Sequence, residues 1–97
     1  MHARVTTISG SPTEADAGID NFRTNVVPLI TQERGKGAIL LVDRQNGEAM
    51  SITLWEDEEA MRASEESANS LRAQAADQMG ATQMPTISRY EVAVFEV

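Results

Sequence analysis

Hydrophobic and polar positions divide the chain into six segments, four with the pattern of strands and two with the pattern of helices. Residues 2–9 hold a cluster of β-branched side chains and stop at a Gly-Ser-Pro turn, so we expect a strand there. Apolar runs or alternation predict three more strands, at residues 38–43, 48–55 and 86–97.

The first helix is expected over residues 12–34. Ser11 is a candidate N-cap, Pro12 suits the first helical position, and Glu14 is placed to complete a capping box. Pro28 either bends this helix or breaks it at the preceding residue, and the pattern leaves both outcomes open. The apolar residues of the segment recur at helical spacing on one face, namely Ala15, Ile19, Phe22, Val26, Leu29 and Ile30.

A hairpin is expected to join the second and third strands. Gly35 and Gly37 are the predicted end of the helix before them. Asn46 and Gly47 lie between two β-rich runs, and both tolerate the positive φ that a type I′ turn needs. These two strands are therefore predicted to be antiparallel neighbours.

The second helix is expected to follow Trp55 and to end near Met79 and Gly80. Glu56 or Asp57 is the candidate N-cap, and the acidic residues of the first turn suit the positive end of the helix dipole. One face of this helix is predicted to be buried, and it comprises Met61, Ser64, Ala68, Leu71, Ala75 and Met79.

The order of these segments predicts a ferredoxin-like α+β fold, βαββαβ, with two helices on one face of a four-stranded antiparallel sheet. We expect one domain, residues 1–97. Residues 38–42 and 92–97 are apolar on both sides of their strands, which is typical of a sheet buried on both faces. Because the helices cover one face only, we predict a homodimer that pairs through the open sheet face.

Composition and charge disfavour several functional classes. A net charge of −7 opposes contact with phosphate backbones, and no apolar run approaches the roughly 20 residues of a spanning helix. We therefore expect neither a nucleic-acid partner nor membrane insertion. The first residues lack the apolar block of a signal peptide, so the expected location is cytoplasmic. With one His and no Cys, no His-rich or thiolate metal site is expected.

The segment LVDRQNGEAMSITLWEDEEAMRASEE, residues 41–66, together with the order of elements, resembles the dimeric α/β-barrel superfamily. This superfamily includes antibiotic-biosynthesis monooxygenases and haem-degrading monooxygenases. The specific feature is a strand that ends in Trp and is followed at once by an acidic helix start and EAMRA. The resemblance implies the fold and the homodimer, and it identifies no single reaction.

The haem-degrading branch is not matched at its functional positions. Its members carry a catalytic Trp nine positions after the strand-ending Trp and a haem-ligating His ten positions further on. Ser64 and Gln74 occupy those positions here, and the first strand contains no counterpart of the family's asparagine. The comparison argues against haem degradation.

The resemblance implies, as the first functional hypothesis, a cofactor-independent monooxygenase or related enzyme that acts on or binds a small aromatic molecule. It places a ligand pocket between sheet and helices and suggests as its lining Phe22, Trp55, Met61, Ser64 and Tyr90. Neither a cofactor nor a metal is expected. The alternative is a non-catalytic ligand-binding or dimerisation module, because no paired acid and base is evident in the sequence.

Several of these residues also have a purely structural interpretation. Trp55 can close the junction of strand and helix, with its indole N–H bonded to a backbone acceptor. Ser64 can let helix and sheet approach closely, with its hydroxyl bonded to a carbonyl one turn back. Tyr90 and Arg89 point to opposite faces of their strand, so at most one of them faces a given cavity. His2 is the only His, and it lies near the terminus.

Overall fold

The computed structural model describes residues 1–78, 80 and 84–97. The strands and helices follow the predicted order. They are β1 (His2–Ser9), η1 (Pro12–Glu14), α1 (Ala15–Asn21), η2 (Phe22–Val26), α2 (Val27–Gln32), β2 (Gly35–Asp43), β3 (Glu48–Trp55), α3 (Glu58–Ala63), α4 (Glu65–Gln78) and β4 (Thr86–Glu91).

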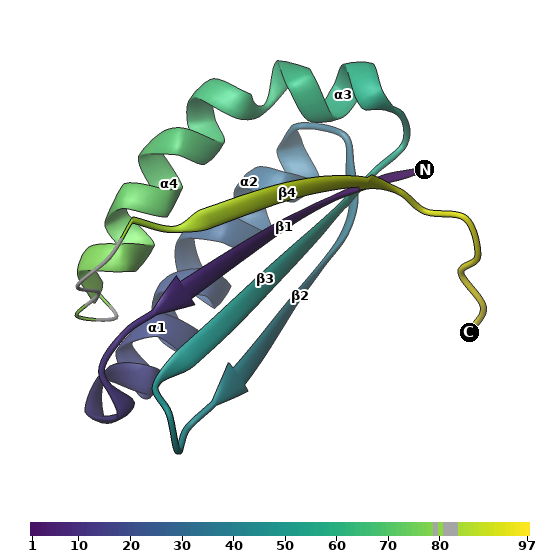
Figure 1. Ribbon diagram of the computed structural model, residues 1–97. Helices are drawn as coiled ribbons and strands as arrows, with labels where there is room; N and C mark the ends of the chain where they lie inside the picture. Colours follow the sequence, from purple (N-terminus) through teal and green to yellow (C-terminus); the bar gives the residue numbers. More distant parts are fainter. Residues whose placement is uncertain (79, 81–83) are drawn as a thin grey trace.

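The strands form one sheet in the order β2-β3-β1-β4. Each neighbouring pair is antiparallel, and β1 lies between β3 and β4. The helices lie together on one face of this sheet, and the opposite face carries none of them (Figure 1). The structure therefore confirms the ferredoxin-like α+β fold with the two helical segments on one side.

The first helical segment is continuous from Pro12 to Gln32, although its start differs from the prediction. Ser11 makes no side-chain hydrogen bond to the helix, so the expected capping box is wrong. Its hydroxyl lies 2.9 Å from the Thr13 hydroxyl instead, and the first turn, η1, is a 3₁₀ turn rather than an α-helical one.

Pro28 does not end this segment. The five residues of η2, immediately before α2, adopt a π-helix. Pro28 has no N–H to donate to the carbonyl of Thr24, and its ring would crowd that carbonyl in a regular helix. The wider π turn accommodates the ring, which is why the helix continues past Pro28.

The end of α2 differs from the expected glycine cap. Arg34 adopts the left-handed conformation, with φ of 66°, and Gly35 is already the first residue of β2. Gly35 is needed for a different reason, because a Cβ on it would lie 2.1 Å from Cγ2 of Ile30. The absence of a side chain there lets α2 and β2 approach each other closely.

The hairpin joins β2 and β3 in the predicted antiparallel register, but the type I′ turn is wrong. The loop has four residues, 44–47, and within it only Gly47 has a positive φ. The carboxylate of Asp43 accepts hydrogen bonds from the backbone N–H groups of Gln45 and Asn46. This Asx-type arrangement holds the longer loop and, with the Asn46 side chain, lowers the pKa of Asp43.

The second helical segment begins as expected but is interrupted. Asp57 is the N-cap, and its Oδ1 accepts a hydrogen bond from Ala60 N at 2.8 Å. The helix breaks at Ser64 into α3 and α4. Met79, the expected last residue of the buried face, lies outside the described residues.

The last strand is shorter than predicted, because β4 ends at Glu91 rather than at residue 97. Glu91 is paired with His2, the first residue of β1, so no neighbouring strand remains beyond it. One more backbone hydrogen bond forms, from Val92 N to Met1 O at 2.9 Å. The final residues then leave the sheet as an extended tail (Figure 1).

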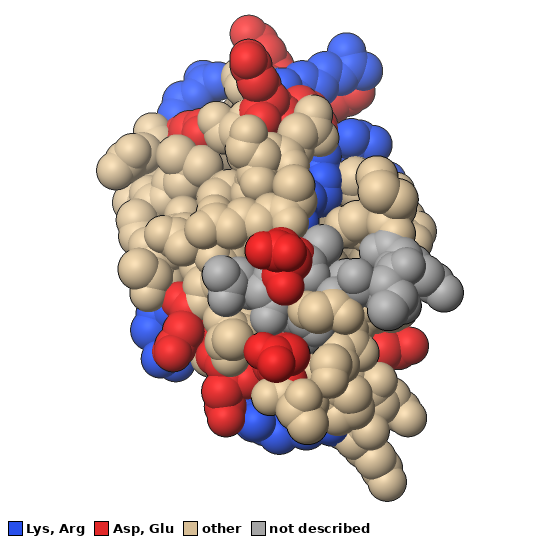
Figure 2. Space-filling model, turned by 90° about the vertical axis from the view of Figure 1, so that its left-hand side faces the viewer, with Lys and Arg blue, Asp and Glu red and all other residues tan. Residues whose placement is uncertain are grey.

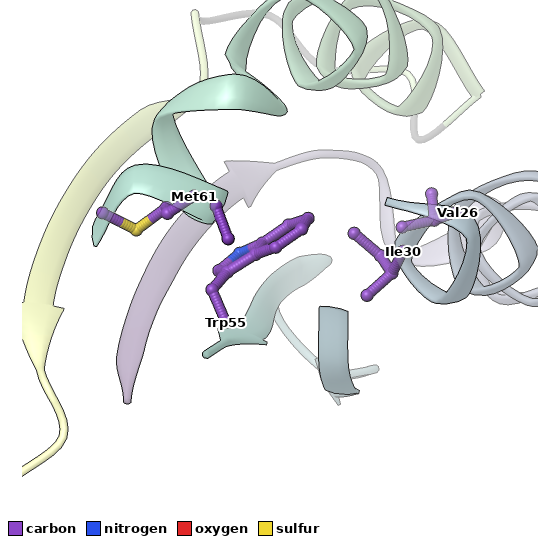
Figure 3. Close-up of a cluster of buried hydrophobic side chains, with 5 residues drawn as sticks. Val26, Ile30, Trp55 and Met61 are labelled. Carbon is purple, nitrogen blue, oxygen red and sulfur yellow. The ribbon is translucent and has the colours of Figure 1, made fainter. Parts of the chain in front are cut away.

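The main core lies between the sheet and the helices. Trp55, at the end of β3, is fully buried, and Figure 3 shows its ring between Met61 of α3 on one side and Ile30 of α2 on the other. A second, smaller cluster forms around Ile8 and Ala49 near the other end of the strands. The two clusters pack the helices against opposite ends of the sheet.

Candidate functional site

A cavity of about 60 Å³ lies between the sheet and the helices. This is several times the roughly 15 Å³ that one water molecule needs. Apolar side chains from both layers make up most of its wall, including Ile8, Phe22, Val26, Leu29, Ile30, Leu40 and Leu71. The cavity is therefore a mainly apolar space with a small number of polar groups at its surface.

Trp55 borders this cavity and is also part of the main core cluster. Its indole Nε1–H donates to the hydroxyl of Thr53 at 3.0 Å, so the expected backbone acceptor is wrong although the indole is satisfied. The guanidinium of Arg4 lies 5.3 Å from the centre of the indole ring, within the range of a cation–π contact.

Ser64 also borders the cavity, at the break between α3 and α4. Its hydroxyl donates to Met61 O at 2.7 Å, which confirms the expected bond to a carbonyl one turn back. The same hydroxyl accepts a hydrogen bond from Arg4 Nη1 at 3.1 Å. Both interactions are within the protein, so this hydroxyl acts as a positioning group for Arg4.

Arg4 is a buried arginine in β1, one of the two inner strands, with 4% of its side chain exposed. Its Nη1 donates to Met61 O at 3.3 Å and to Glu65 Oε1 at 3.2 Å, in addition to Ser64. Burial lowers the pKa of Arg4, and the nearby Glu65 carboxylate acts in the opposite direction. The buried charge is stabilised because it is paired and hydrogen-bonded.

Three arginines, Arg4, Arg72 and Arg89, surround the carboxylate of Glu65, and these four residues form one charged cluster. Arg89 Nε donates to Glu65 Oε1 at 2.9 Å, and an Nη2 nitrogen of Arg72 lies 3.7 Å from Oε2. The hydrogen bond from Arg89 is the main cause that lowers the pKa of Glu65, and the same bond raises the pKa of Arg89. Three guanidinium groups thus share one carboxylate.

Two buried N–H donors at the cavity have no hydrogen-bond partner among the described residues. They are Nδ2 of Asn21, at the end of α1, and Nη1 of Arg72, on α4. Asn25 donates to the Asn21 oxygen at 2.8 Å, which leaves the amide nitrogen of Asn21 free. Buried polar groups are nearly always paired, so these donors are the groups of the wall best suited to hold a ligand.

The five residues suggested by the resemblance divide between two places. Phe22, Trp55 and Ser64 border the cavity. Met61 and Tyr90 border a separate, more open depression near the start of β1. Tyr90 is 56% exposed, whereas Arg89 reaches Glu65 on the helix side, as expected for neighbouring residues of one strand.

Within the described part of the chain, no three His, Cys, Asp or Glu side chains are grouped closely enough to hold a metal ion. None of the helices described is long and apolar enough to cross a membrane.

A family model described as antibiotic biosynthesis monooxygenase matches residues 1–76, which include β1 to β3 and all the described residues of the cavity wall. The chain belongs to the antibiotic biosynthesis monooxygenase family. Two uncharacterised proteins of Mycobacterium tuberculosis are similar to this family member, one 37% identical over 94 residues and the other 43% identical over 77 residues. These alignments cover 96% and 78% of the chain but only 41% and 33% of the relatives, so the chain spans less than half of their length.

Solved structures share the fold of this antibiotic biosynthesis monooxygenase family member. A monooxygenase from the ActVA-Orf6 gene of Streptomyces coelicolor, in complex with nanaomycin D, superimposes with a TM-score of 0.76 at 16% identity. The match covers 99% of this chain and 92% of that one. A Nitrosomonas europaea protein of unknown function gives 0.74 at 19% identity, with the same coverage. These likenesses show the fold.

Sequence reasoning about this family member missed Arg4, Asn21 and Arg72. Asn21 lies outside the apolar face that the helical spacing predicts, and its burial becomes evident only in the structure. Arg4 occupies a position of β1 whose side chain faces the helices. The alternation of the strand does not distinguish a buried arginine from an exposed one.

Proposed function

We propose that the chain binds a small, mainly aromatic molecule in the cavity and oxidises it with molecular oxygen. The observation that carries this proposal is the unpaired amide nitrogen of Asn21 in an otherwise apolar wall. A buried donor without a partner costs about 1–3 kcal/mol, and an oxygen atom of a bound ligand would offset this cost. Asn21 therefore acts as the group that orients the ligand.

The reaction is a monooxygenation in which the substrate itself provides the electrons. A phenol such as 1-naphthol reacts with O₂ to give the quinone and one water, so one oxygen atom enters the ring and the other is reduced. The hydrogen bond from Asn21 stabilises the negative charge that develops on the phenol oxygen as its proton leaves. Glu33 is the one carboxylate among the described residues of the cavity wall, and it is the candidate proton acceptor.

Family membership supports an oxidation, because the matching model describes a monooxygenase family. The Streptomyces coelicolor monooxygenase of the same fold was solved with nanaomycin D, and this supports an aromatic ligand. Neither comparison identifies the substrate of this chain. The apolar wall and its few donors support the choice of an aromatic phenol.

The experiment fills the cavity without changing the surface. Ala68 is buried and borders the cavity, whereas Ala73 is exposed on the same helix, so A68L and A73L are a matched pair. We expect A68L to weaken 1-naphthol binding at least tenfold by NMR titration and to abolish oxygen uptake in air. A73L should behave as the wild type. Equal binding by both variants would contradict the cavity as the site.

A second candidate function is ligand binding without catalysis. One observation favours it, because the described residues of the cavity wall include no histidine and only one carboxylate, Glu33, which is not fully buried. Saturable binding of 1-naphthol to the wild type, with no oxygen uptake and no quinone formed, would support this function over the monooxygenase.

We further propose that two copies pair through the open face of the sheet. Four apolar side chains of this face are more than a third exposed, namely Ile39, Leu41, Met50 and Tyr90. The C-terminal tail adds exposed Val94 and Phe95. Apolar groups gathered in this way are typical of an interface, and the family's members are commonly dimeric.

A further inference from the structure

The cavity wall includes two arginines, Arg4 and Arg72, and one acidic residue, Glu33. The two guanidinium groups differ in what they already bind. Arg4 Nη1 makes three hydrogen bonds, to Met61, Ser64 and Glu65. Arg4 is thus a structural cation at one edge of the cavity, and its Nη1 is fully engaged.

Arg72 is engaged only in part. Its side chain is 11% exposed, and one nitrogen, Nη2, donates to Asn69. The contact from Arg72 to Glu65 is 3.7 Å, too long for a hydrogen bond. The second nitrogen, Nη1, is buried and has no partner among the described residues. Arg72 therefore carries a positive charge and a free donor at the cavity.

The surroundings of Arg72 do not neutralise this charge. Glu65 is shared with Arg4 and Arg89, both of which hydrogen-bond to its Oε1, so positive charge in the cluster exceeds negative charge by two. Burial lowers the pKa of Arg72, and the Glu65 carboxylate acts in the opposite direction. Figure 2 shows basic atoms between uncharged residues on the face that it presents.

We infer that the ligand carries a carboxylate group, which Arg72 binds through its free Nη1 nitrogen. This inference rests on the proposed function, since it specifies the substrate class of the same cavity as small aromatic acids. A carboxylate suits a guanidinium because its two oxygens accept charge-assisted hydrogen bonds in one plane. Asn21 then meets an oxygen elsewhere on the ligand, and the apolar wall encloses the ring.

The test compares an acid with its neutral amide. trans-Cinnamate and trans-cinnamamide have nearly the same shape, and NMR titration of the wild type measures both dissociation constants. We expect the acid to bind about tenfold more tightly or better, because charge-assisted hydrogen bonds are roughly twice as strong as neutral ones. R72Q should remove this preference, and R72K should retain part of it because the charge remains.

R62Q is the matched control, since Arg62 is an exposed arginine of α3 paired with Glu58, and it should keep the full preference for the acid. Equal binding of acid and amide by the wild type would overturn the inference and leave the proposed function standing. Loss of the preference in R62Q as well as in R72Q would also overturn it. If neither compound nor 1-naphthol binds the wild type, the proposed function fails together with the inference.

Discussion

Arg4 and Trp55 are the residues on which the junction of β1, β3 and α3 depends. The guanidinium lies over the indole ring, and its Nη1 reaches the last turn of α3 and the first residue of α4. A buried arginine is tolerated because its hydrogen bonds and its carboxylate partner offset the loss of hydration. Packing at this junction and charge pairing beside the cavity thus involve the same side chains.

Glu65 makes this junction sensitive to acid. Its pKa is lowered in the folded state, below the value of about 4.3 for an unfolded glutamate. A lowered pKa means that the ionised carboxylate stabilises the folded protein above pH 4.3, and that this contribution is lost as the pH falls through the folded-state pKa. The contribution is therefore full at pH 7 and lost in strong acid.

We expect E65Q to lower the free energy of unfolding by about 2 kcal/mol at pH 7, because Arg4 and Arg89 lose their charged partner. The difference from wild type should shrink at pH 3. Urea unfolding at both pH values measures it. E66Q is the control, since Glu66 is the exposed neighbour of Glu65 on the same turn. If the free energy of unfolding of E65Q stays below that of the wild type by the same amount at pH 7 and pH 3, the ionised Glu65 carboxylate is not the cause.

At the scale of single residues, the sequence predicts packing better than polar contacts. The interpretation of Trp55 as a buried residue closing the strand–helix junction is confirmed, and so is the Ser64 bond one turn back. The expected backbone acceptor of the indole is wrong, because the acceptor is the hydroxyl of Thr53, two residues earlier on the same face of the strand. Hydropathy patterns indicate which face is buried, but not which polar atoms meet across it.

Elements are joined in this fold by close approaches that depend on single glycines. Gly35 of β2 lies against the last turn of α2, where an added Cβ would be 2.1 Å from Ile30 Cγ2 and 2.6 Å from Ile30 O. Because one of these atoms belongs to the backbone, the contact cannot be relieved by rotating a side chain. The helix and the strand would have to move apart.

We predict that G35A lowers the free energy of unfolding by about 3 kcal/mol, measured by urea denaturation. Gly37 is the matched control, two residues further along the same strand, where an added Cβ would meet only Leu54 Cδ1 at 3.5 Å. G37A should change stability by less than about 1 kcal/mol. Similar losses in the two variants would show that strand flexibility, and not the contact with α2, controls stability here.

The sequence predicts the order of the strands and helices. It does not predict where a helix changes its geometry or breaks, or where the last strand ends. The π turn before Pro28, the break at Ser64 and the early end of β4 all depend on tertiary contacts. β4 ends where β1 offers no further partner, a limit that the alternation of Val92 and Val94 does not reveal. Local patterns predict which elements form, and neighbouring elements determine where they end.

At the scale of the whole molecule, the two faces of the sheet have different roles. The helix-covered face contains the cavity with its free donors, at the place between sheet and helices that the family resemblance implies. The residues that line the cavity were predicted only in part, because Asn21 and Arg72 become candidates only when their missing partners are known. The second face carries no helix and remains apolar.

The register of β2 and β3 brings the apolar residues of the open face together, with Leu41 opposite Met50 and Ile39 opposite Ile52. Burying several hundred Å² of such surface on each of two copies, at about 25 cal/mol per Å², is worth on the order of 10 kcal/mol before the costs of association. This magnitude favours a stable homodimer over an exposed sheet.

We therefore predict that the protein sediments at twice its chain mass of 10.6 kDa at micromolar concentration. L41D places a charge within the proposed interface and should give a folded monomer, because a buried unpaired carboxylate is costly. V27D is the matched control, since Val27 is an exposed apolar residue of α2, away from the sheet, and it should remain dimeric. Circular dichroism of each variant separates loss of pairing from loss of fold. A wild type that sediments at 10.6 kDa would contradict the prediction, and the apolar face would then need a different partner.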